Sequence, residues 1–196
     1  MNNDNSHQEP PECDPHFLKM LEKWNRVRHP SKEHELLKSL AGEWDVLLRF
    51  HAGDQSWESS CIARKELIHE GRFLLEQLTG EIFAPDDTGT MRREPYSATR
   101  LLGYDNFKRG YVGAFIENQN TSLLTFIGRP RLGGNASEID MYGEADEAML
   151  DLHDGTMRYT LRVMGQDDHL WEVYALAAGP KTRLFDFIYT RCSPHG

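Results

Sequence analysis

Cysteine and long apolar runs are both scarce in this sequence, and each shortage limits the kind of protein it encodes. The three cysteines, Cys13, Cys61 and Cys192, are odd in number and far apart. This pattern indicates neither a disulfide framework nor the paired spacing of a zinc site. No stretch reaches the roughly 20 apolar residues of a membrane-spanning helix, and residues 1–15 lack the basic and apolar parts of a signal peptide. We therefore expect a cytoplasmic protein with reduced thiols.

Positive charge is also in short supply. The chain carries 22 Lys and Arg against 31 Asp and Glu, which gives a formal net charge of −9. A field of this sign repels nucleic acid and anionic membrane surfaces, and no run of lysines or arginines offsets it. We therefore expect neither a nucleic-acid partner nor a membrane partner.

Motifs of catalysis and metal binding are missing as well. The chain has no Gly-x-Ser-x-Gly, no P-loop and no dinucleotide fingerprint, and its nine histidines form no His-x-His or His-x-x-x-His pair. A carboxylate pair such as Glu144 and Glu172 could meet in an interior, although such residues usually face solvent. We assign no catalytic residue, no metal site and no cofactor. The sequence favours a binding protein over an enzyme and leaves both open.

The first 30 residues differ in composition and pattern from the rest of the chain. Residues 1–15 are polar and rich in proline, which predicts disorder. Apolar residues at helical spacing then predict a short amphipathic helix over 16–29. Residues 31–193 form one domain, which begins with a second short helix at about 32–40.

From Gly42 onward, turn residues recur about every dozen positions between segments rich in β-branched and aromatic residues. Ten short-linked strands form an antiparallel meander, and closing a meander removes its exposed edges. The sequence therefore predicts a mainly β fold, a closed up-and-down barrel. It predicts a tight turn at Asp154-Gly155 and a long mobile excursion at 84–95. The expected strands are 43–51, 57–69, 72–83, 96–104, 110–117, 122–129, 136–144, 156–164, 169–176 and 182–191.

Alternation defines the expected inner face of the barrel. In the first strand, every second residue from Trp44 to Phe50 is apolar. Closure makes the first and last strands neighbours, so Arg191 is expected beside Trp44, as a stopper of one barrel end. Gly42 lets the incoming helix turn tightly across that end. The expected inward set is Val46, Leu48, Phe50, Phe115, Tyr142, Tyr174, Phe185, Phe187 and Tyr189.

A Gly-x-Trp on the first strand with an Arg on the last resembles the calycins, the superfamily of lipocalins and fatty-acid-binding proteins. Four stretches sharpen the match: "HELLKSLAGEWDV", "GRFLLEQLTG", "LLGYDNFKRGYVGAFIEN" and "FIYTR". Together they resemble the bacterial DUF1579 family over about residues 34–191. The resemblance implies a calycin-like barrel and no defined activity. The leader and the 84–95 segment look like additions to the family pattern.

Ten strands leave room for a small ligand, so we expect a small apolar or amphipathic molecule inside. Aromatic and aliphatic side chains would hold its body, and a few polar groups would orient its head. Tyr104 and Asn118 also have a purely local reading, as turn and packing residues. The candidate ligand-binding residues are Phe50, Glu76, Arg100, Tyr104, Phe115, Asn118, Tyr142, Glu144, Tyr174, Phe187 and Tyr189.

Two alternatives remain at this stage. A strand histidine could ligate haem, as in related ten-stranded calycin barrels of the nitrobindin type, which would make the protein a haem-binding or enzymatic barrel. In the other, aromatic side chains fill the barrel completely and the protein acts through partners, as a homodimer. Leu47, Leu184 and Ile188 are the expected outward apolar residues for such an interface, unless the helices at 16–40 cover them.

Overall fold

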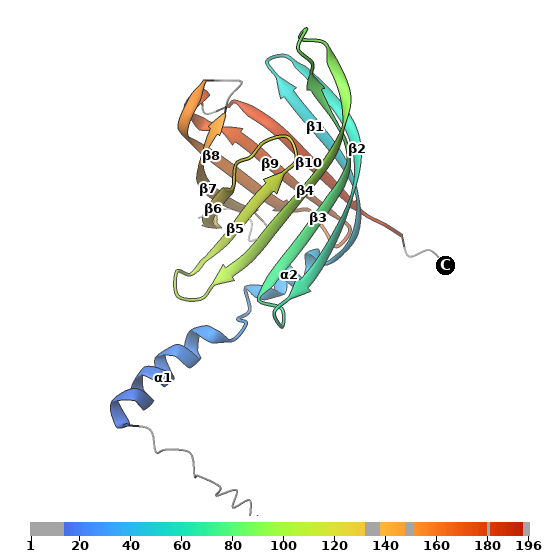
Figure 1. The fold of residues 1–196 in the computed structure, drawn as a ribbon. Helices are drawn as coiled ribbons and strands as arrows, with labels where there is room; N and C mark the ends of the chain where they lie inside the picture. Colours follow the sequence, from blue (N-terminus) through green and yellow to red (C-terminus); the bar gives the residue numbers. More distant parts are fainter. Residues whose placement is uncertain (1–13, 132–137, 148–150, 180, 194–196) are drawn as a thin grey trace, which may run out of the picture.

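A computed structural model of the chain contains two helices and one closed barrel of ten antiparallel strands (Figure 1). It describes residues 14–131, 138–147, 151–179 and 181–193. Each strand pairs with the next in sequence, and β10 closes the barrel on β1. The elements are α1 (Pro15–Arg28), α2 (His34–Leu40), β1 (Gly42–Ala52), β2 (Gln55–Ile68), β3 (Phe73–Pro85), β4 (Met91–Asp105), β5 (Gly110–Glu117), β6 (Leu124–Pro130), β7 (Glu138–Glu147), β8 (Leu152–Val163), β9 (Asp168–Ala175), the 3₁₀ turn Leu176–Ala178 and β10 (Arg183–Arg191).

The predicted meander and its closure are confirmed. In the β1–β10 ladder, Trp44 lies opposite Arg191 and Phe50 lies opposite Phe185. Trp44, Val46, Leu48 and Phe50 are all buried, so the apolar face of β1 points into the barrel as its alternation indicates. An antiparallel meander of this kind needs only short connections, and closure leaves no strand edge unpaired.

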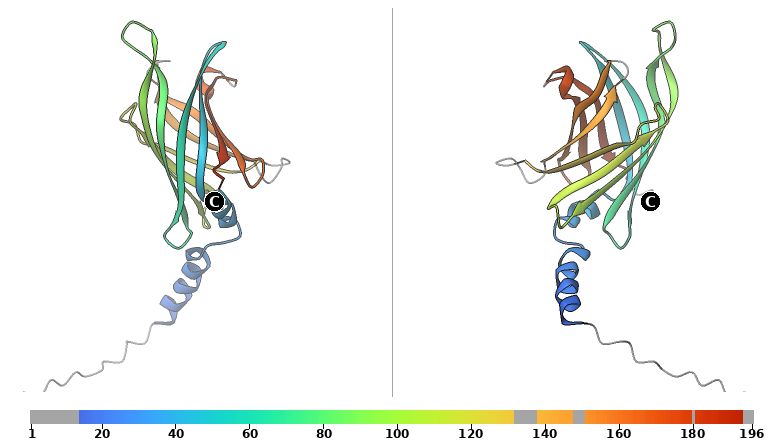
Figure 2. Two further views of the ribbon diagram at one scale, coloured as in Figure 1. Left: turned by 90° about the vertical axis from the view of Figure 1, so that its right-hand side faces the viewer. Right: turned by 60° about the vertical axis from the view of Figure 1, so that its left-hand side comes forward.

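The prediction of a long mobile excursion at 84–95 is wrong. β3 and β4 stay paired as far as Pro85 and Met91, so only residues 86–90 form the connection. The carboxylate of Asp86 accepts hydrogen bonds from the backbone N–H groups of Thr88 and Thr90, at 2.9 and 3.0 Å. This local capping lets the two strands continue as a hairpin that projects beyond the rest of the barrel (Figure 2).

The tight turn expected at Asp154-Gly155 is also wrong, because both residues lie inside β8. Ala145 pairs with Gly155, Glu147 pairs with Leu152, and the register shifts between these two pairs. Asp154 adopts a φ of 51°, a conformation that aspartate tolerates and that a strand irregularity needs. The turn chemistry in the sequence therefore marks a bulge in the strand and not its end.

The helices lie at one end of the barrel and differ in how much they bury. α2 packs its buried residues His34, Leu37 and Leu40 under the barrel end, whereas α1 has no buried residue and points away (Figures 1 and 2). The Arg72 side chain donates to the carbonyl of Arg28 at 3.0 Å, which ties down the C-terminal end of α1. Disorder was predicted for residues 1–15, and residues 1–13 of this segment lie outside the described residues. Among those described, no helix combines the length and apolar character needed to span a bilayer.

Candidate functional site

The closed end of the barrel is built around Trp44. The indole N–H donates to the carbonyl of Leu40 in α2 at 3.0 Å, and the Arg191 guanidinium lies 4.1 Å from the centre of the ring. Arg191 also donates to the carbonyls of Ser39 and Ala41, at 2.7 and 2.9 Å. Gly42 has a φ of 132°, and a Cβ there would lie 2.6 Å from the guanidinium. Glycine at this position therefore allows both the chain path and the approach of Arg191.

Three charged side chains lie buried next to this end, on three consecutive strands. Lys65 of β2 pairs in register with Glu76 of β3, and Glu76 pairs with Arg100 of β4. The Glu76 carboxylate is 3.4 Å from the Lys65 ammonium and 3.0 Å from the Arg100 guanidinium. All three are at most 5% exposed. Buried charges persist in proteins only when they are paired and hydrogen-bonded, as they are here.

Two rings complete this cluster from the opposite wall. The Tyr189 hydroxyl donates to Glu76 at 2.6 Å and accepts from Arg100 at 3.0 Å. His169, opposite Tyr189 in the β9–β10 ladder, stacks on its ring at a centroid distance of 4.1 Å. The His169 Nε2 lies 2.6 Å from the Lys65 ammonium. We call Lys65, Glu76, Arg100, His169 and Tyr189 the buried polar cluster.

Burial and mutual charge set the protonation of this cluster. Burial is the main cause that lowers the pKa of Lys65, to about 8, against the attraction of Glu76. Burial acts to raise the pKa of Glu76, but Arg100 and Lys65 together lower it. Burial and the nearby Lys65 lower the pKa of His169, which is therefore neutral and accepts through Nε2. At neutral pH the cluster thus holds two cations and one anion.

The lowered pKa of Lys65 predicts a pH-dependent stability. Between pH 8 and 10.5 the unfolded chain holds a proton on Lys65 that the folded chain has released, so stability rises with pH. From pH 7 to 9.5 this single group raises the free energy of unfolding by about 2 kcal/mol. Denaturant titrations at several pH values should show this rise in the wild type relative to Lys65→Met. The exposed Lys38→Met variant is the control and should match the wild type; equal profiles for all three would contradict the assignment.

A small cavity lies on the side of Arg100 away from α2. Its volume is about 60 Å³, and aromatic and aliphatic side chains make most of its wall. Arg100 stacks on Trp171, with 4.1 Å between the guanidinium carbon and the ring centre. The lining residues are Tyr96, Arg100, Phe115, Glu117, Asn120, Leu124, Phe126, Ala145, Asp146, Met157, Tyr159, Trp171, Val173, Leu184, Phe185 and Phe187.

Two polar atoms of this wall have no hydrogen-bond partner in the described chain. They are the Arg100 Nε and the Tyr159 hydroxyl oxygen, on side chains only 4% and 2% exposed. Burial raises the pKa of Tyr159 to about 12, so its hydroxyl keeps its proton and stays a donor. Unpaired buried donors cost free energy in a folded protein, and such groups usually indicate a ligand, a water or a functional role.

The cavity continues into a wider hollow at the open end of the barrel. This hollow has a volume of about 600 Å³, and Glu117, Asn120, Asp146 and Phe185 line both spaces. It lies where β1, β3, β5 and β7 end and β8 and β10 begin, opposite α2. The two spaces therefore adjoin each other between Arg100 and the open end of the barrel.

The structure brings together six of the eleven predicted ligand-binding residues. Arg100, Phe115 and Phe187 line the cavity, and Phe50 lines the hollow at its mouth. Glu76 and Tyr189 stand directly behind Arg100, in the buried polar cluster.

The other five predicted residues lie elsewhere. The inward orientation expected for Tyr142 and Tyr174 is wrong: Tyr142 is 45% exposed, and Tyr174 donates to Glu172 on the outer face. Glu144 borders the same outer hollow as Tyr142 and never meets Glu172 in the interior. In β7 and β9 the expected parity was off by one residue, which reverses every side chain.

Tyr104 and Asn118 have local structural roles, in packing and in a turn, as the alternative interpretation predicted. Tyr104 packs at the closed end, edge-on to His34 and Tyr111, far from the barrel mouth. The Asn118 side chain is exposed and bonds to the backbone of Ser97 and Pro95.

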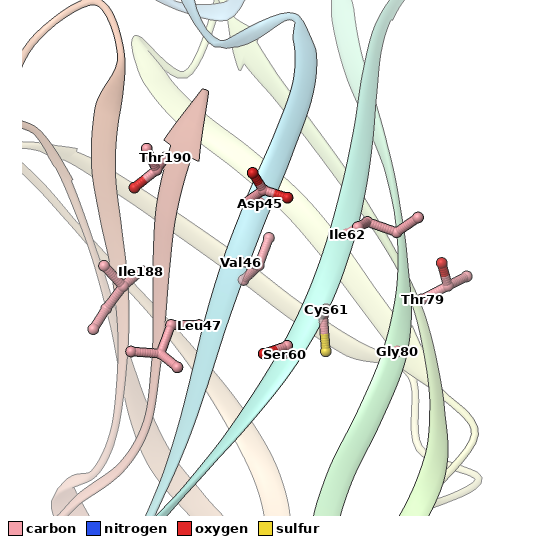
Figure 3. Close-up of a pocket in the computed structure, with 10 residues that line it drawn as sticks. All are labelled: Asp45, Val46, Leu47, Ser60, Cys61, Ile62, Thr79, Gly80, Ile188 and Thr190. Carbon is pink, nitrogen blue, oxygen red and sulfur yellow. The ribbon is translucent and has the colours of Figure 1, made fainter. Parts of the chain in front are cut away.

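The outward orientation expected for Leu184 is also wrong, because Leu184 is buried and lines the cavity. The β9–β10 register shifts between Arg183 and Phe185, and this bulge turns Leu184 inward beside Phe185. Leu47 and Ile188 do face outward. Together with Ile62 they border a shallow hollow on the outer faces of β10, β1, β2 and β3 (Figure 3). That hollow contains none of the buried polar cluster.

Sequence reasoning missed four residues of the site: Lys65, Tyr159, His169 and Trp171. Lys65 continues the buried series Ser59, Cys61 and Ala63 at every second position of β2. This series of small residues gave little hydrophobic signal, and a lysine at its end reads as a solvent-exposed residue. Correct parity in β9 would have found His169 and Trp171, which alternate inward with Val173.

The chain matches the model of a family described as protein of unknown function (DUF1579) over residues 29–191. It belongs to this family. The match covers the barrel, α2 and the short link before it, so the expected DUF1579 resemblance is confirmed and extends slightly further toward the N-terminus. A comparison with curated proteins gives no match. In the described part of this DUF1579 protein, no group of three His, Cys, Asp or Glu side chains is placed to hold a metal ion.

Proposed function

We propose that this DUF1579 barrel, which we infer to be calycin-like, binds a small amphipathic molecule in the cavity beside Arg100. The observation that supports this most directly is the pair of unpartnered donors, Arg100 Nε and Tyr159 Oη, in the wall of an otherwise apolar cavity. A fully packed structural barrel gains nothing from leaving two buried donors unpaired. A ligand with an apolar body and a polar head accounts for both features.

The volumes limit the size and position of the ligand. A cavity of about 150 Å³ is known to admit a benzene ring, whereas the space beside Arg100 is about 60 Å³. It therefore holds a polar head and a few carbon atoms. The rest of the molecule extends into the hollow of about 600 Å³ at the open end.

Native mass spectrometry of freshly purified protein, compared with its denatured mass, is the first test. An additional mass that disappears on denaturation would identify a retained occupant. Apo protein is then titrated with 1-octanol and sodium octanoate and followed by calorimetry and thermal unfolding. Binding of either probe with a rise in melting temperature supports the proposal. No retained occupant and no binding of either probe would contradict it. A dimer peak in the same spectra would support a homodimer that uses the outward apolar residues Leu47 and Ile188.

Filling the cavity provides a sharper test. Val173 lines the cavity on β9, and a phenylalanine there would occupy most of its 60 Å³. We expect Val173→Phe to lower the affinity for both probes at least tenfold while the circular dichroism spectrum stays that of a barrel. Val112→Phe is the matched control, because Val112 borders an outer hollow. Binding that is unchanged in Val173→Phe, or lost equally in the control, would place the probes elsewhere.

The residues present do not fit the haem alternative. No described histidine lines the cavity, and the buried His169 has its Nε2 turned to Lys65 and its ring stacked on Tyr189. His153 borders the hollow at the open end, but its side chain is 83% exposed and lies 3.6 Å from Asp146. A porphyrin is also several times larger than the 60 Å³ beside Arg100.

A further inference from the structure

We propose that the head of the ligand is a carboxylate, which accepts hydrogen bonds from Arg100 Nε and Tyr159 Oη at the inner end of the cavity. This inference rests on the proposed function and adds the chemical class of the ligand. It follows from the donors in the cavity wall, from the charges behind them and from the charges at the mouth.

The cavity wall contains two hydrogen-bond donors that a ligand head could satisfy. The Arg100 guanidinium uses its Nη1 for Glu76 and Tyr189, and its Nε remains without a partner in the described chain. The Tyr159 hydroxyl is likewise free of partners, and both residues line the same cavity. Each atom offers one N–H or O–H, so the missing group must accept two hydrogen bonds. A carboxylate has two oxygens for this, and bonds of ionised groups to such donors are the strong ones.

The charges behind the cavity favour an anion over a neutral acceptor. Within the buried polar cluster, the two cations Lys65 and Arg100 face a single carboxylate, that of Glu76. An excess positive charge in a site of low polarity is unfavourable, and a ligand carboxylate would balance it. His169 and Tyr189 add no charge, since the first is neutral and the second stays protonated.

The charges at the mouth orient the ligand. Glu117 and Asp146 lie between the cavity and the hollow at the open end of the barrel. The Tyr96 hydroxyl donates to Glu117 at 2.6 Å. These carboxylates repel an anionic head at the mouth, whereas Arg100 attracts it at the inner end. A carboxylate ligand is therefore most stable with its head inward and its apolar chain toward the hollow.

The first test compares matched probes that differ only at the head: octanoate, 1-octanol and octylamine. We expect octanoate to bind at least tenfold more tightly than octanol, and octylamine to bind more weakly than octanol. Octanol binding as tightly as octanoate, with both lost in Val173→Phe, would overturn the carboxylate head and leave the proposed cavity ligand standing. Binding of none of the probes would instead contradict the proposed function itself.

Tyr159→Phe tests the inner end without breaking the charged cluster, which substitution of Arg100 would do. It removes an unpaired buried hydroxyl, so the apo protein should melt at the same temperature or higher. Its affinity for octanoate should fall about tenfold, and that for octanol by a smaller factor. Tyr111→Phe is the control, since its hydroxyl bonds to Glu33 at the closed end and its loss should leave octanoate binding unchanged. Octanoate binding unaffected by Tyr159→Phe would overturn the assignment.

A direct reading of the head comes from the carbon-13 spectrum of octanoate labelled at its carboxyl carbon. Beside Arg100 the bound carboxylate should titrate at a lower pH than the free acid, because a neighbouring cation favours the ionised form. A bound carboxyl that titrates at a higher pH than free octanoate would place the head away from Arg100 and overturn the proposal.

Discussion

Replacing Glu76 with alanine should lower the free energy of unfolding by about 3–5 kcal/mol, the usual effect of removing one member of a buried ion pair. Lys65 and Arg100 would both lose the carboxylate that faces them, and the Tyr189 hydroxyl would lose its acceptor at 2.6 Å. Chemical denaturation monitored by tryptophan fluorescence measures the change. The stabilisation by Glu76 is present above the ordinary carboxylate pKa and is lost as pH falls through the lowered pKa of the folded state.

Glu81→Ala is the matched control on the same strand. Glu81 bonds to Arg93 at 2.8 Å, but both side chains are more than half exposed. Such exposed pairs contribute at most about 1 kcal/mol. A double variant, Glu76→Ala with Lys65→Met, should recover part of the loss, because one unpaired cation is removed. A loss below about 1 kcal/mol for Glu76→Ala, or no recovery in the double variant, would show that the cluster is not coupled as its distances indicate.

Trp44→Ala is the second substitution with a large expected effect, a loss of about 3–5 kcal/mol in the free energy of unfolding. The indole is 1% exposed and contacts the rings of His169 and Tyr189 edge-on. Its loss would leave a cavity between α2 and the buried polar cluster, and would remove the ring on which Arg191 lies. The same denaturation experiment measures this change.

An exposed Trp–Arg pair in the same chain supplies the control. The Arg28 guanidinium lies 4.5 Å from the centre of the Trp24 ring, and Trp24 is 54% exposed. Exposed pairs of this kind contribute about 0.5–1 kcal/mol, so Trp24→Ala should have little effect. Similar losses for the two tryptophans would mean that Trp44 does not close the barrel end.

The fold follows from local patterns in the sequence. Alternation from Trp44 to Phe50 identified the inner face of β1, and turn residues at regular intervals identified the ten strands. The closure of β10 on β1 was predictable for a physical reason, because an open meander exposes two edges. The pairing of Trp44 with Arg191 then followed from closure alone.

The candidate site depended on features that no local pattern fixes. Lys65, Glu76 and Arg100 lie on three strands, and only the register of two ladders places them side by side. In β7 and β9 an error of one residue reversed the predicted face, and in β10 a bulge turned Leu184 inward. A strand sequence determines that alternate residues share a face. The side chains that meet inside the barrel, and the unpaired donors Arg100 Nε and Tyr159 Oη of the cavity wall, are decided by how ten strands align around the closed ring.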